Sequence, residues 1–127
     1  LSPQLFWGKA PKGTKSFALT AFDPDAPTGS GWWHWIVLNI PAGTHSLAQG
    51  ASGQLKQGLE TRTDFGKPGF GGACPPVGDG MHRYQFTIWA LPQEKIDLPA
   101  DISPAAVGFT LNSLMLEKAT LTATYVR

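Results

Sequence analysis

The chain has 127 residues with a formal net charge of +1, and only 15% of the residues are charged. Lysine and arginine stand singly along the sequence, which argues against an electrostatic surface for nucleic acid. No apolar run approaches the roughly 20 residues needed to span a bilayer. The length suits one domain over residues 1–127, and 15 glycines and 11 prolines among aromatic-rich runs favour a mostly β protein.

Residues 16–22 alternate in the two-residue rhythm of a β-strand that delivers Asp23 at its end. The segment Asp23-Pro24-Asp25-Ala26-Pro27 follows, and each proline pushes the residue before it toward extended geometry. Residues two apart in an extended segment point to the same side, so we expect Asp23 and Asp25 to face one place. The alternative is that both aspartates are turn formers that bond their own backbone.

A glycine-containing turn at residues 28–31 leads into Trp32-Trp33-His34-Trp35. Residues 35–40 are almost continuously apolar and predict a central strand that is covered on both faces and ends at Pro41. His34 by itself is compatible with a half-buried core histidine. A polar connection at residues 42–56 follows, and residues 55–62 are compatible with a short strand.

Residues 64–80 hold six of the fifteen glycines and three prolines, so we expect a long loop of the kind that is usually functional. The next predicted strand covers residues 83–91 and can begin as early as Met81. Alternation would place an imidazole and a phenol on the same side at its start, above an apolar tail. The residues that share this face are His82, Tyr84, Phe86, Ile88 and Ala90.

One helix is predicted near the C-terminus. Ser103 suits its N-cap and Pro104 its first turn. Apolar positions at helical spacing extend the prediction to Lys118, near the end where the helix dipole favours a cation. Residues 119–126 alternate again and predict a closing strand. The predicted fold class is therefore all-β with one C-terminal helix.

Two separated motifs carry a resemblance to a known family. They are the segments Asp23–Pro27 with Trp32–Trp35, and Cys74-Pro75-Pro76 followed by His82-Arg83-Tyr84. Together they resemble the phosphatidylethanolamine-binding protein family, and most closely its bacterial YbhB/YbcL-like branch. The resemblance extends from Ser2 to Tyr125. It implies an antiparallel, Greek-key-like β-sandwich with a C-terminal helix, no cofactor, no metal and no catalytic residue.

The resemblance also implies a ligand pocket for phosphate-type headgroups. Imidazolium and phenol groups can donate hydrogen bonds to phosphoryl oxygens, whereas free carboxylates would repel the same anion. We therefore expect the two aspartates to orient and charge the histidines, and a tryptophan at the rim to cover the ligand or meet an ammonium group. The residues that match the pocket are Asp23, Asp25, Trp32, His34, Pro76, His82 and Tyr84.

Two other functions are alternatives to a binding pocket. A metal-dependent hydrolase would use the two aspartates and two histidines, but their spacing matches no compact metal motif, and Ser30 lacks the frame of a nucleophile elbow. A kinase- or protease-inhibitory interaction module is implied by analogy with relatives alone. The resemblance further suggests a homodimer. These readings leave the physiological ligand open.

Cys74 is the single cysteine, so the chain cannot form an internal disulfide. It is read either as a partly buried inert thiol or as a residue whose partner lies in a segment preceding Leu1. Relatives often carry such a segment, and the chain is expected to lack it. The compartment, bacterial periplasm or cytoplasm, stays open.

Overall fold

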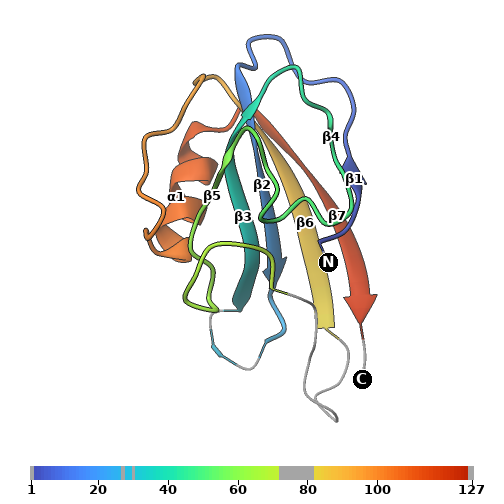
Figure 1. Cartoon of the computed structure of the whole chain (residues 1–127), viewed down its shortest axis with the longest axis vertical. Helices are drawn as coiled ribbons and strands as arrows, with labels where there is room; N and C mark the ends of the chain where they lie inside the picture. The colour runs from blue at the N-terminus through green and yellow to red at the C-terminus, as the bar shows by residue number, and fades with distance from the viewer. Residues whose placement is uncertain (1, 27, 30, 72–81, 126–127) are drawn as a thin grey trace.

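The computed structural model describes residues 2–26, 28–29, 31–71 and 82–125 (Figure 1). Its elements in chain order are β1 (Leu5–Phe6), β2 (Ser16–Asp23), β3 (Trp32–Pro41), β4 (Ser46–Leu47), β5 (Leu59–Glu60), β6 (His82–Leu91), α1 (Pro104–Leu114) and β7 (Glu117–Tyr125).

Five strands form one antiparallel sheet in the order β5-β3-β2-β6-β7, and β1 pairs with β4 in a separate small sheet. Within the large sheet, β2, β3 and β5 are neighbours in succession, and β6 returns to the free side of β2. A fourth strand that lies beside the first after a long connection defines a Greek key. The all-β antiparallel class with one helix is thus confirmed, with a second sheet of only two short strands.

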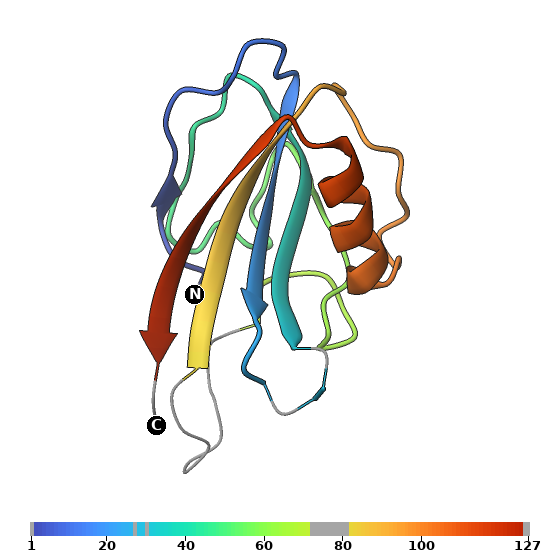
Figure 2. The same ribbon diagram turned by 180° about the vertical axis from the view of Figure 1, so that it is seen from behind.

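Both faces of the large sheet are covered, which accounts for the continuous apolar run in β3. Trp35 and Val37 belong to a cluster with Phe17 and Leu19, against which Leu5 and Leu47 of the small sheet pack. The small sheet lies over this face of the large sheet in Figure 1. The neighbouring β3 side chains Ile36 and Leu38 belong to the opposite cluster, which includes the buried helix residues Val107 and Leu111. The view from behind shows α1 along that second face (Figure 2). Burial of apolar side chains on both faces therefore makes the sheet the centre of the fold.

The bounds of several elements differ from the sequence-based expectation. β3 begins at Trp32 instead of Trp35, because antiparallel pairing with β2 continues to the pair Asp23 and Trp32. β5 is confined to two residues that pair with Val37 and Leu38, where a strand over 55–62 was expected.

The helix ends at Leu114, so the prediction that it reaches Lys118 is wrong. Met115 has an extended backbone (φ −60°, ψ 144°), and the backbone N–H of Leu116 donates to Ala90 O at 2.8 Å. The chain has thus already turned into β7, where the Lys118 ammonium lies 4.9 Å from the centre of the Trp89 ring. The predicted N-cap is confirmed, since the Ser103 side chain accepts from the backbone N–H of Ala106. No helix in the described ranges is long and apolar enough to cross a membrane.

Candidate functional site

The candidate site lies at the end of the sheet where β2 finishes and β3 and β6 begin. Asp23 is the last residue of β2 and pairs with Trp32, the first residue of β3. On the other side of β2, Phe22 pairs with Gln85, which places Tyr84 at the same end. Antiparallel pairing thus brings three predicted site residues together, although up to 61 positions separate them in the sequence.

Gly31 allows this close approach of β2 and β3. Its backbone is left-handed, with φ +80°, a region that glycine enters at little cost. A Cβ atom at this position would overlap the Phe22 ring and lie 2.9 Å from the carbonyl oxygen of Asp23. Glycine is therefore required here both for the backbone conformation and for the space.

Asp23 is buried, with 2% of its surface exposed, and its Oδ1 atom accepts the backbone N–H of Asp25 at 2.8 Å. This bond spans two residues, as in an Asx turn. In this contact Asp23 acts as a turn former, which is the alternative that the sequence left open. The hydrogen bond holds the bend at Pro24 and Asp25. Asp25 itself is half-buried.

His34 is 7% exposed and is held by the loop that follows β5. Its Nδ1 atom lies 2.9 Å from the carbonyl oxygen of Gly71, and the Gly71 N–H donates to the His34 carbonyl at 2.9 Å. A carbonyl oxygen can only accept, so Nδ1 carries the hydrogen. Nε2 of His34 then bears a hydrogen only when the ring is protonated.

A β-bulge orients the His34 side chain toward the candidate site. On β2, Ala21 pairs with Trp35 and the next residue, Phe22, pairs with Trp33. His34 is therefore the extra residue on β3 between these two pairs. Trp35 belongs to the cluster under the small sheet, whereas Trp33 packs with the cluster under the helix. His34 contacts Tyr84 edge to face, with 5.3 Å between ring centroids. The extra residue therefore turns His34 to the same face as Trp35.

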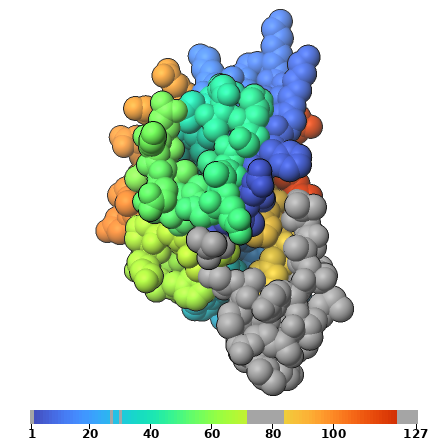
Figure 3. Space-filling model, turned by 45° about the vertical axis from the view of Figure 1, so that its right-hand side comes forward, coloured from blue at the N-terminus to red at the C-terminus, as the bar shows by residue number. Residues whose placement is uncertain are grey.

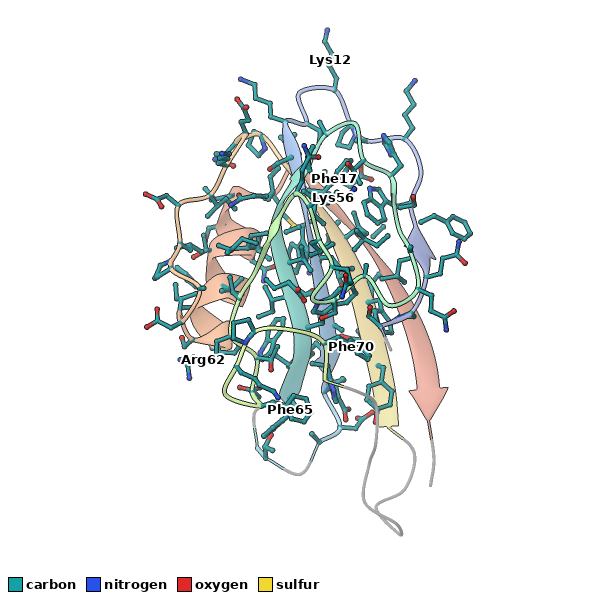
Figure 4. The ribbon with its side chains drawn as sticks, viewed as in Figure 1. Lys12, Phe17, Lys56, Arg62, Phe65 and Phe70 are labelled. Carbon is teal, nitrogen blue, oxygen red and sulfur yellow. The ribbon has the colours of Figure 1, made fainter. Side chains whose placement is uncertain are left out.

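Phe65 completes the aromatic surroundings and was missed in the sequence. Its ring lies edge to face against Trp32 and His34, with centroid distances of 5.4 and 5.5 Å. It is 47% exposed and lies near the lower end of the sheet (Figure 4). In the sequence, the feature that could have pointed to Phe65 is its position next to Asp64. In the structure, Oδ2 of Asp64 accepts the Trp33 backbone N–H at 2.8 Å and connects the loop to β3.

Two predicted site residues lie wholly or in part outside the described residues. Pro76 lies outside the described residues, as does Cys74. His82 is the first residue of β6 and pairs with Tyr125, but its side chain also lies outside the described part. Among the described residues there is no group of three or more His, Cys, Asp or Glu side chains that could hold a metal ion.

Comparison with known proteins places the chain in a family. The phosphatidylethanolamine-binding protein family matches residues 1–126. The chain is 52% identical to the UPF0098 protein YbcL of Escherichia coli (strain K12), over 98% of this chain and 70% of that protein. It is also 52% identical to the UPF0098 protein YbhB of the same organism, over 98% of this chain and 81% of the relative.

Solved structures agree with this result. The crystal structure of E. coli YbcL, described as a new member of the mammalian PEBP family, matches with a TM-score of 0.92 and 49% identity, covering 99% of this chain and 80% of that one. A putative PEBP homologue from Chlamydia trachomatis matches with a TM-score of 0.84 and 27% identity, covering 99% and 81% of the two chains. The protein belongs to the phosphatidylethanolamine-binding protein family.

Proposed function

We propose that the protein is a non-enzymatic binding protein whose site at the end of the sheet binds a phosphate-type headgroup, either phosphatidylethanolamine-like or of another phosphorylated ligand. The observation that carries the proposal is the buried His34 ring, fixed through Nδ1 by Gly71 and in contact with Tyr84. A histidine held in this way is oriented before the ligand arrives. The family name gives independent support.

The chemistry follows from the hydrogen on Nδ1. Protonation of His34 adds a second donor at Nε2, and a bond from imidazolium to a phosphoryl oxygen contributes roughly 1.5–3 kcal/mol. The Tyr84 phenol can donate a further bond. Asp23 is assigned to shaping the turn and orienting the donors, because a carboxylate would repel the anion. Trp32 and Phe65 are assigned to covering the ligand or to contact with an ammonium group.

The test is an NMR titration of the histidine side chains with inorganic phosphate and with phosphoethanolamine, in EDTA at about pH 6. We expect the His34 resonances to move at submillimolar ligand. His45 is the internal control, since it is exposed and its Nδ1 lies 3.2 Å from the Gly8 carbonyl. No movement of His34 with either compound would contradict the proposal, and movement only after adding a divalent cation would favour a metal-dependent enzyme instead.

Absence of catalysis is proposed together with binding. We expect no turnover of a simple phosphate ester in EDTA or with added divalent cations, and a turnover that disappears in His34→Ala would overturn this point. A kinase- or protease-inhibitory role and a homodimer stay predictions from the resemblance. A pull-down compared between the natural chain and His34→Ala, together with the mass in solution, would test them.

A further inference from the structure

A cavity of about 500 Å³ lies beside the candidate site. It is open to solvent on one side and is lined by the turn at residues 52–53, by Glu60 of β5 and by residues of the loop at 65–71. These segments adjoin one another on the face of the molecule in Figure 3. Phe65 and Gly71 line the cavity, and both also contact His34. The cavity and the candidate site therefore share a wall.

Glu60 supplies the negative charge of this cavity. Its Oε2 atom accepts from Trp35 Nε1 at 2.8 Å and from Ser52 Oγ at 2.6 Å, and its Oε1 atom accepts from the Gly53 N–H at 2.7 Å. All three donors are neutral. Within the ranges that the structure describes, Glu60 forms no ion pair with a lysine, arginine or histidine. A carboxylate has about four lone-pair sites, so Oε1 can accept a further bond.

The surroundings hold this carboxylate in place. Ser52 Oγ donates to Glu60 and also accepts the Phe70 backbone N–H at 2.7 Å, which joins the two loops. Gly69 has φ +106°, and a Cβ there would lie 4.0 Å from Glu60 Oε2, so the loop passes close to the charge. The Phe70 ring packs edge to face on the Trp35 ring, with 5.6 Å between the ring centroids. Lys67, also part of the lining, is exposed.

The Glu60 carboxylate is half-buried and is held by three neutral donors, so none of the hydrogen bonds that it accepts comes from a cationic side chain. A cation that enters such a cavity gains both the charge interaction and the open acceptor site on Oε1. The aromatic rings of Phe65 and Phe70 favour an organic cation with an aliphatic stem over a hydrated metal ion. A protonated primary amine combines these features.

We propose that the Glu60 cavity is an amine subsite, which receives the protonated amine of a ligand whose phosphate-type group lies at His34. This inference rests on the proposed function and assigns the cationic end of the ligand to a specific carboxylate. It makes Glu60 a specificity-determining residue that distinguishes aminoalkyl phosphates from alkyl phosphates of the same length.

The experiment compares matched ligand pairs by calorimetry. Phosphoethanolamine is measured against ethyl phosphate, and 3-aminopropyl phosphate against propyl phosphate, so that each pair differs in the amine alone. We expect the amine to tighten binding roughly tenfold in at least one pair, as a charge-assisted hydrogen bond does. The Glu60→Gln variant should bring that ratio close to one while the alkyl phosphates bind as before.

A control variant tests whether the loss of any negative charge has the same effect. Glu94→Gln removes one negative charge from an exposed residue that lines a different groove, and it should keep the ratio. A measurement that needs no variant is the Trp35 indole N–H resonance, which should shift with the aminoalkyl phosphates and not with the alkyl phosphates.

The outcomes distinguish the two proposals. If neither member of either pair binds, the result contradicts both the proposed function and the amine subsite. If alkyl phosphates bind but the ratio is near one in the natural chain, only the amine subsite is overturned. A ratio that persists in Glu60→Gln also overturns the amine subsite, since the preference for the amine would then come from the aromatic rim.

Discussion

The rings of His34 and Tyr84 meet edge to face at 5.3 Å although their strands, β3 and β6, are separated by β2. The contact depends on the bulge that turns His34 toward the face on which Tyr84 lies. It also depends on the Gly71 carbonyl, which holds the imidazole from the loop side. The orientation of the histidine is therefore determined by two strands and one loop that are distant in sequence.

Anion binding should strengthen as the pH falls. With Nδ1 bonded to the Gly71 carbonyl, Nε2 of His34 donates only in the imidazolium form, and histidine titrates near pH 6.5 in model peptides. We expect sulfate, which keeps its charge over this range, to bind several-fold more tightly at about pH 6 than at about pH 8. Calorimetry in EDTA measures this. His34→Gln should lose the pH dependence and His45→Gln should retain it, and a tighter complex at the higher pH would exclude the imidazolium.

Replacing Gly71 by alanine should displace the aromatic wall. A Cβ atom at Gly71 would overlap the Phe65 ring, which would have to leave its contact with His34. We expect a loss of about 1–3 kcal/mol in the free energy of unfolding, as for other overpacked sites, together with a changed His34 imidazole signal in the ligand-free protein. Urea denaturation and NMR measure the two effects. Gly43→Ala is the matched control, because nothing lies within 4 Å of that added atom. Equal effects at both positions would contradict the packing account.

Asp23 should contribute to stability through its acceptor oxygen. Asp23→Ala leaves the Asp25 N–H without its 2.8 Å partner, whereas Asp23→Asn keeps an acceptor of similar shape. Loss of a buried hydrogen-bond partner costs about 1–3 kcal/mol, so we expect the alanine variant to unfold at clearly lower urea concentration than the asparagine variant. If the two variants lost the same stability, the charge of Asp23 would matter more than its bond to the turn.

Two glycines of the same turn should differ in their tolerance of alanine. Gly29 and Gly31 both have left-handed backbones, with φ +83° and +80°, but nothing lies within 4 Å of a Cβ at Gly29. Gly29→Ala should therefore cost only the conformational term, about 1 kcal/mol. Gly31→Ala adds the overlap with Phe22 and should cost about 1–3 kcal/mol more. Thermal and urea unfolding of the two variants give the difference, and similar losses would show that Phe22 moves aside freely.

The sequence by itself determined the local elements and the identity of most candidate site residues. Alternation in residues 16–22 predicted β2, and the apolar run after Trp35 predicted a strand covered on both faces. Ser103 and Pro104 predicted where α1 begins. These signals are local, because side-chain periodicity and helix capping involve residues within a few positions of one another.

Tertiary structure alone decided on which face of the sheet the His34 side chain lies and which residues surround it. Strict alternation would place His34 on the face of Ile36, and only pairing with β2 creates the bulge that reverses it. Phe65 and Glu60 carry no motif, and they become site and cavity residues because the 63–71 loop folds back on β3 through contacts such as that of Asp64 with Trp33. Such contacts join residues tens of positions apart, so that no local pattern records them.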